Sequence, residues 1–222
     1  NSLCTRCHTL AKYDGPVHHH HAEKESLALD GTRCVDCHMP DKKYMLVDPR
    51  RDHSLRVPRP DLTAKFGTPN ACNTCHDKKD ETPEWAAAKI VEWYGAKRAG
   101  NESYAGALAG GRAGKPQAEA MLIELARENK APAIARATAV SLLRNYPASS
   151  QSLAAVERAL EDESPLVRAA AASTLGQLAE ALPPAQSAKY LKTHVSSLLD
   201  DPLREVRTEA ARALAGVPPS TF

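Results

Sequence analysis

The sequence predicts a mainly α-helical protein in two parts, an irregular N-terminal domain followed by an α-solenoid. Three observations predict this architecture. All six Cys of the 222 residues lie in three Cys-x-x-Cys-His motifs near the N-terminus. A Gly-rich stretch follows them. The rest of the chain is rich in Ala and Leu and repeats with a period close to 40 residues, which is typical of paired-helix repeats.

Composition and charge exclude several classes of protein. Lys and Arg number 29 against 27 Asp and Glu, and a formal net charge of +2 argues against a dedicated nucleic-acid binder. No apolar run approaches the roughly 18–20 residues of a membrane span. No basic segment with an apolar stretch after it stands at Asn1, so we expect any export signal to have been removed already.

The three motifs carry the chemistry. Each is the attachment signature of c-type haem, in which two thiols on one turn add to two vinyl groups of a porphyrin and the adjacent His coordinates the iron. We therefore expect three covalently attached haem c groups, with His8, His38 and His76 as the proximal iron ligands. The thiols that attach them are those of Cys4, Cys7, Cys34, Cys37, Cys72 and Cys75.

Other uses of these Cys explain less of the pattern. A zinc site takes four N or S ligands, so six Cys leave one pair over, and nothing in that scheme places a His after every pair. A thioredoxin-type motif needs a βαβ setting that the sequence lacks. Disulfides across two residues are strained.

Residues 1–95 form the first predicted domain, an irregular, haem-cored cytochrome domain. Pro-rich segments such as 57–60 cannot lie inside a helix. Aromatic residues make up only 5% of the chain, and three macrocycles would supply the missing apolar core. A helix over 82–95 closes the domain, with Thr82 as its N-cap, Pro83 in its first turn and Gly95 at its end. Residues 96–114 are predicted to be a Gly-rich linker.

Residues 115–222 are predicted to form helical repeats. At an offset of 39 residues, six positions match. The pairs are Leu160 and Leu199, Asp162 and Asp201, Val167 and Val206, Arg168 and Arg207, Ala171 and Ala210, and Leu175 and Leu214, with a looser earlier copy at Arg136, Ala139 and Leu143. The pattern resembles HEAT repeats. In that family the Asp and Arg satisfy the turn within a repeat and its neighbours, while Val, Ala and Leu pack between helices.

Six segments carry a wider resemblance. They are Val17-His18-His19-His20-His21, Gly31-Thr-Arg-Cys34-Val-Asp-Cys37-His38-Met39-Pro40, Tyr44-Met-Leu-Val-Asp48, Arg50-Arg-Asp-His53-Ser-Leu-Arg-Val-Pro-Arg-Pro60-Asp-Leu, Gly67-Thr-Pro-Asn-Ala-Cys72-Asn-Thr-Cys75-His76 and Glu84-Trp85-Ala86. Together they resemble a family of multihaem c-type cytochromes with C-terminal HEAT or TPR repeats. Longer members of that family carry further haem motifs upstream, so we expect this chain to be the C-terminal section of such a protein or a processed chain.

The distal iron ligands are expected among the remaining His. The family shows a similar His cluster in which the position of His20 is often not His. The resemblance therefore favours His18, His19 and His21, together with His53, as distal ligands. Met39 and Met45 are alternatives, but with His in surplus we expect bis-His ligation of all three haems. His194 lies in the repeats and is read as an ordinary helix residue.

Closely spaced, fully ligated haems predict electron transfer, with the HEAT-like region as a docking or assembly surface. The expected role is electron carrier rather than catalyst. Two alternatives stay open: the electron-input section of a multihaem oxidoreductase of nitrite or hydroxylamine type, or a repeat scaffold with structural haems.

Partners and location follow from the same reading. We expect other cytochromes or redox proteins as partners, and no nucleic acid. Because Cys4 stands so near the start, the first haem is expected to lie within van der Waals reach of a haem on an upstream section, a neighbouring chain or a second copy that propagates as a filament. Arg50, Arg51, Arg56, Arg59 and Lys65 are predicted to pair with haem propionates or an acidic partner. Haem c is attached after export, so we expect a periplasmic or extracellular protein.

Overall fold

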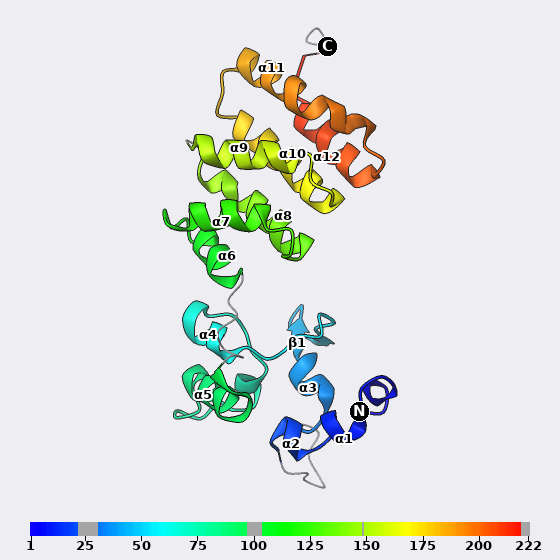
Figure 1. Ribbon diagram of the computed structural model, residues 1–222, viewed down its shortest axis with the longest axis vertical. Helices are drawn as coiled ribbons and strands as arrows, with labels where there is room; N and C mark the ends of the chain where they lie inside the picture. Colours follow the sequence, from blue (N-terminus) through cyan, green and yellow to red (C-terminus); the bar gives the residue numbers. More distant parts are fainter. Residues whose placement is uncertain (22–30, 97–103, 148, 219–222) are drawn as a thin grey trace. The chain divides into compact units, whose positions relative to one another are not determined.

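Helices dominate the computed structural model, which describes residues 1–21, 31–96, 104–147 and 149–218 (Figure 1). The chain falls into two units, Asn1–Asn101 and Glu102–Phe222. Each unit is described by itself below. The mainly helical architecture agrees with the fold class that the sequence predicts.

Short elements make up the first unit. In chain order they are η1 (Cys4–Arg6), α1 (Leu10–Tyr13), α2 (Pro16–His19), α3 (Cys34–His38), β1 (Asp41–Tyr44), β2 (Asp48–Arg51), α4 (Pro60–Phe66), η2 (Cys72–Thr74) and α5 (Pro83–Tyr94). The helix predicted over 82–95 corresponds to α5, which packs against α4 and η2. Its N-cap is Thr82, whose side chain accepts a hydrogen bond from the Trp85 N–H, and Gly95 ends it at a φ of +82°.

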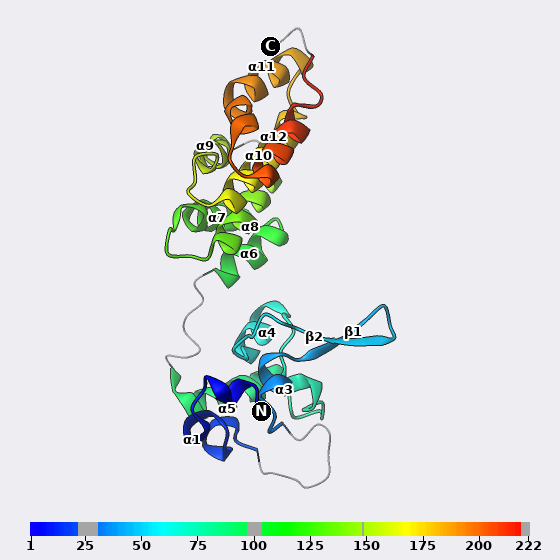
Figure 2. The ribbon, with the colours of Figure 1, turned by 90° about the vertical axis from the view of Figure 1, so that its right-hand side faces the viewer.

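The sequence analysis did not predict the hairpin of β1 and β2. The two strands pair antiparallel, with Asp41 opposite Arg51 and Tyr44 opposite Asp48 (Figure 2). The turn between them holds Met45 at a φ of +48° and Leu46 at +69°. Hairpin turns of this kind usually carry Asn-Gly or Asp-Gly, and an apolar pair gives no such signal.

Almost no apolar side chain of the first unit is buried. Among its described residues, only Pro60, Ala71 and Ala86 are buried. Large apolar side chains are exposed instead, including Leu3, Leu10, Val17, Leu46, Val47 and Leu55. A unit of this size needs buried apolar surface to offset the conformational entropy lost on folding. The described residues of this unit do not supply it.

The second unit is a stack of helices. They are α6 (Ala105–Arg112), α7 (Ala118–Arg127), α8 (Ala133–Leu142), η4 (Leu143–Asn145), α9 (Ser150–Ala159), α10 (Pro165–Ala179), α11 (Pro184–Val195), η5 (Ser196–Asp200) and α12 (Arg204–Leu214). Helices α8, α10 and α12 pack in sequence against one another, and α7, α9 and α11 pair with them. The matched residues Val167, Ala171, Leu175, Val206, Ala210 and Leu214 are all buried in one apolar core.

The linker predicted over 96–114 is wrong for its C-terminal half, where α6 lies and packs against α7 and α8. Residues 97–103 of that prediction lie outside the described residues. The Gly residues serve close packing rather than flexibility. A Cβ on Gly110 would stand 2.8 Å from the Ala118 Cβ, and one on Gly111 would stand 2.8 Å from a methyl of Leu122. Gly therefore allows α6 to approach α7.

An Arg–Asp ladder joins successive repeats. Arg136 donates to the Asp162 carboxylate at 2.8 Å, and Arg168 donates to that of Asp201 at 2.8 Å and 3.1 Å. Arg168 also donates to the Asp162 carbonyl at 2.8 Å, and Arg207 donates to the Asp201 carbonyl at 2.6 Å. Each Asp thus links its own turn to the preceding repeat, as the HEAT-like pattern predicts.

None of the helices in the described part of the chain is long and apolar enough to cross a membrane.

Candidate haem-binding site

The three Cys-x-x-Cys-His motifs each form one helical turn. In the first and third, the His8 N–H donates to the Cys4 carbonyl and the His76 N–H to the Cys72 carbonyl, both at 3.0 Å. The second motif forms α3. Residues three apart share a face of a helical turn, so each turn presents two thiols on one side with an imidazole next to them.

The six cysteines form no disulfide with one another, and cysteines of neighbouring motifs interact electrostatically. Burial, followed by the neighbouring Cys4, raises the pKa of Cys34. Burial raises the pKa of Cys37 to about 11, with Cys72 the next cause and Cys75 a smaller one. The second motif therefore lies near both of the others, and its thiols are protonated at neutral pH.

Two of the motif histidines are oriented through Nδ1. The His38 Nδ1 lies 2.8 Å from the Arg56 carbonyl oxygen, and the His76 Nδ1 lies 3.3 Å from a carboxylate oxygen of Glu81. The hydrogen bond from His76 is the main cause that lowers the pKa of Glu81. An Nδ1–H that donates to an oxygen leaves Nε2 without a proton and available to a metal ion.

The four consecutive histidines of residues 18–21, called the His run below, begin in α2 and continue past its end. The run lies among the motifs. The His21 Nδ1 is in hydrogen-bond contact with the His19 carbonyl, again leaving Nε2 available. The His19 Nδ1 instead accepts the His21 backbone N–H at 3.1 Å. His20 adopts a φ of +55° and stacks on Trp93 with ring centres 4.2 Å apart. Burial lowers the pKa of His20, whose Nε2 is buried without a hydrogen-bond partner.

Two His of the run lie at similar ring-centre distances from two motif His. The ring centres of His18 and His38 lie 6.1 Å apart with planes inclined by 12°. Those of His21 and His76 lie 6.0 Å apart with an inclination of 44°. The rings of His18 and His38 are near-parallel like those of His20 and Trp93, but their centres lie farther apart.

Gly31 makes room for the ring of His21. A Cβ at this position would stand 2.8 Å from the His21 Cδ2 and 2.9 Å from its Nε2, and Gly31 has a φ of +72°. No other residue type fits there without moving the imidazole. The sequence analysis did not assign Gly31 a role. One indication of this role was present in the sequence, which is that a Gly stands three residues before the second motif.

Aromatic residues of α5 cover the His run and the third motif. Trp85 lies 4.9 Å from the His76 ring, and the Tyr94 hydroxyl donates to the His18 carbonyl. Together with the Trp93 stack, these contacts fasten the His run to α5.

The structure does not bring His53 to a motif histidine. Its side chain is exposed, and its Nδ1 lies 2.9 Å from the Arg51 carbonyl oxygen. The neighbouring Asp52 accepts hydrogen bonds from Ser54 and does not orient the His53 ring. For His8, the ring partner within the described residues is Tyr13, with ring centres 5.5 Å apart.

The arginines predicted to meet propionates have carboxylate partners within the chain. Arg50 pairs with Asp48, Arg51 with Asp36, Arg56 with Asp52, and Arg59 with Asp61. Arg51 also donates to the carbonyls of Val35 and Met39, at 3.2 Å and 3.1 Å. Its guanidinium thus supports α3, a role that the sequence analysis missed because the carbonyl partners are set by tertiary structure.

These residues fit a haem group better than a directly bound metal ion. The thiols stand in pairs on helical turns, and the Nδ1 atoms of His21, His38 and His76 are held so that their Nε2 atoms are available. The unit also lacks the apolar core that macrocycles would provide. Within the residues that the structure describes, no group of three or more His, Cys, Asp or Glu side chains is placed to hold a metal ion by itself.

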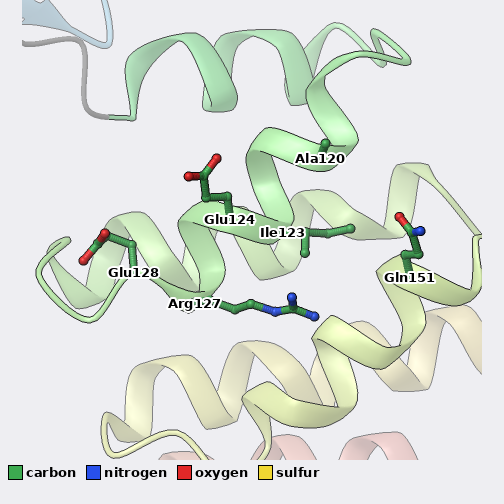
Figure 3. A pocket seen from close by; sticks show the side chains of 6 residues that line it. All are labelled: Ala120, Ile123, Glu124, Arg127, Glu128 and Gln151. Carbon is green, nitrogen blue, oxygen red and sulfur yellow. The ribbon is translucent and has the colours of Figure 1, made fainter.

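A separate open groove lies on the second unit (Figure 3). It has a volume of about 430 Å³, and Arg127 and the carboxylates of α7 line it opposite the α9 residue Gln151. Its lining contains no Cys or His. His194 also lies in this unit, on α11 beside Tyr190. Neither feature belongs to the candidate haem-binding site.

Comparison with known proteins identifies the repeats. Residues 119–215 match the family model for HEAT repeats. The match covers α7 to α12, the helices joined by the Arg–Asp ladder. Searches of curated proteins and of solved structures found no significant match to the chain.

Proposed function

We propose that the chain is a multihaem c-type cytochrome that carries electrons, with three haem c groups on residues 1–95. One observation carries the proposal. Three helical turns present paired thiols and an imidazole around one His run, in a unit that buries almost no apolar side chain of its own.

The paired thiols on each helical turn suit covalent attachment to haem. Attachment would add the S–H of each motif Cys across one haem vinyl group, with the sulfur bonding to one vinyl carbon and the hydrogen to the other. No oxidant or reductant is consumed in this addition. Burial raises the pKa of Cys37 and of Cys72, which keeps both as thiols before attachment.

The chain's own residues orient the iron ligands. The Arg56 carbonyl and the Glu81 carboxylate hold Nδ1 of His38 and His76, which directs Nε2 of each ring away from those oxygens. Bound haem c supplies an iron that cycles between two oxidation states. His18 and His21 would supply second imidazoles to the haems of the second and third motifs, which supports electron transfer rather than catalysis at those haems.

The HEAT-like repeats are proposed as a docking or assembly surface for other cytochromes or redox proteins. Stacked repeats present an extended surface to partners. The buried core of the repeats contains no Cys or His of the motifs.

Intact mass tests the proposal most directly. We expect the chain to carry the mass of three haems, to stain for haem peroxidase activity on a denaturing gel, and to be recovered from a periplasmic or extracellular fraction. Replacing both Cys of one motif by Ala should remove one haem. Replacing His194 by Ala, in the second unit, is the control and should remove none. A chain with free thiols or bound zinc and no haem contradicts the proposal.

A second candidate function rests on His8. Because its ring partner is Tyr13 rather than an imidazole, the first haem could present an open side, as in the electron-input section of a multihaem oxidoreductase. Electron paramagnetic resonance (EPR) separates the two functions. Three low-spin haems support an electron carrier, while one high-spin haem on the first motif supports the enzyme.

A further inference from the structure

We propose that the His run supplies the distal ligands of two neighbouring haems. His18 is the partner of His38 on the second haem, and His21 is the partner of His76 on the third. The inference rests on the proposed function and goes further, because neither the motifs nor the resemblance assigns any distal His to a particular haem.

The ring separations carry the assignment. A metal–imidazole bond is about 2.0–2.1 Å long and each ring adds its own radius, so two imidazoles on opposite sides of one metal have ring centres roughly 6 Å apart. The observed separations are 6.1 Å for His18 and His38 and 6.0 Å for His21 and His76. Direct stacking in the same unit brings the ring centres of His20 and Trp93 to 4.2 Å.

Hydrogen bonds select the ligands within the run. The His21 Nδ1 contacts a carbonyl, so its Nε2 can ligate. The His19 Nδ1 accepts a backbone N–H, so the proton of a neutral His19 ring lies on Nε2, which then cannot bind a metal. The His20 ring is occupied by its stack on Trp93. Of the three adjacent rings, the arrangement therefore assigns His21 and excludes His19 and His20.

The backbone explains how one short run reaches two motifs. His20 adopts the left-handed conformation and ends α2, so the chain changes direction between His18 and His21. The Tyr94 hydroxyl holds the His18 carbonyl, and Gly31 leaves space for the His21 ring. Three residues of separation then hold the second and third haems next to each other, as direct electron exchange requires.

The test uses the full-length holoprotein and variants of single histidines. His18→Ala and His21→Ala should each convert one further haem from low-spin to high-spin relative to the unchanged protein, as counted by EPR and resonance Raman spectroscopy. His194→Ala, which changes a histidine of the second unit, is the control and should leave the spin count unchanged. Intact mass is measured first for every variant.

Removing one haem at a time tests the pairing. In a Cys34→Ala/Cys37→Ala background, which lacks the second haem, His18→Ala should add no high-spin haem, while His21→Ala should still add one. A Cys72→Ala/Cys75→Ala background should give the reverse. If His18→Ala converts a haem in the first background, the pairing is overturned.

A ligand exchange covers the case in which an Ala variant loses haem. His18→Met and His21→Met keep a sixth ligand and should each raise the reduction potential of one haem, because Met/His ligation has a higher potential than bis-His. Unchanged potentials overturn the inference. Three haems with unchanged spin states in the Ala variants refute the pairing alone, whereas a chain without haem refutes the proposed function.

Discussion

Single side chains set the geometry of the His run, and Gly31 is the sharpest example. Replacing Gly31 by Ala places a Cβ within 3 Å of two atoms of the His21 ring, so the imidazole must move. We expect Gly31→Ala to convert one low-spin haem to high-spin. The measurement is EPR of the holoprotein.

Gly67 provides the matched control at the residue scale. It has a similar φ of +68°, but nothing lies within 4 Å of an added Cβ. Gly67→Ala therefore carries the same left-handed strain, about 1 kcal/mol, without the clash. It should lower thermal stability slightly and leave all spin states as they were. Equal spectra for both variants would show that Gly31 does not position His21.

Individual residues also show how much of the candidate site could be predicted from the sequence. The Cys-x-x-Cys-His motif itself contains the Cys and His expected to bind haem, so these residues can be predicted from the sequence alone. The partners of Nδ1 are different: the Arg56 carbonyl lies 18 residues from His38, and a backbone oxygen has no signature in a sequence. Glu81, five residues after His76, carried a weak signal as a carboxylate close to a predicted ligand.

Among the elements, the Arg–Asp ladder holds the repeats in register. Asp201 accepts two hydrogen bonds from Arg168 and a third from the Leu203 N–H. Asp201→Asn leaves the partly buried Arg168 guanidinium without its counter-charge, and we expect a loss of about 3 kcal/mol in the free energy of unfolding. Denaturant unfolding followed by circular dichroism measures it. Glu209→Gln breaks an exposed pair with Arg212 and should change the same quantity by less than about 0.5 kcal/mol.

The ladder also predicts a pH dependence. The hydrogen bond from Arg168 is the main cause that lowers the pKa of Asp201. A carboxyl with a lowered folded-state pKa stabilises the protein above its unfolded-state pKa, which is about 3.9, and that stabilisation is lost as the pH falls through the folded-state pKa. The difference in melting temperature between the unchanged protein and Asp201→Asn should be constant from pH 7 to about pH 5 and shrink below about pH 4. A difference that stays constant down to pH 2 contradicts this role.

At the scale of elements, the sequence predicted the helices whose buried residues recur with a regular period or whose ends carry capping residues. The repeats were found because Val, Ala and Leu recur on the buried faces of α10 and α12, and α5 because Thr82 and Gly95 mark its ends. Helix α6 was missed because Gly110 and Gly111 read as flexible, although their missing side chains allow close packing on α7. The hairpin was missed because Met45 and Leu46 are unusual residues for a left-handed turn.

At the scale of the whole molecule, the two units differ in where their stability comes from. The second unit has a continuous core that includes Leu122, Val140, Val167, Leu175 and Val206. The first unit buries Pro60, Ala71 and Ala86 among its described residues, and little else that is apolar. If haem supplies the core of the first unit, the units should respond differently to its absence.

We therefore expect the full-length chain, produced without haem attachment and with its thiols reduced, to be folded in its second unit and unfolded over residues 1–95. Circular dichroism should show the helices of the second unit and a cooperative unfolding transition, because its core needs no cofactor. Limited proteolysis should cut residues 1–95 rapidly and leave a fragment that begins near residue 102, whereas the haem-loaded protein should resist in both parts. A variant with all six Cys replaced by Ala, produced under haem-attaching conditions, should behave like the haem-free chain. Equal protease resistance of residues 1–95 with and without haem would show that the polypeptide alone folds this unit, and the argument from its missing core would fail.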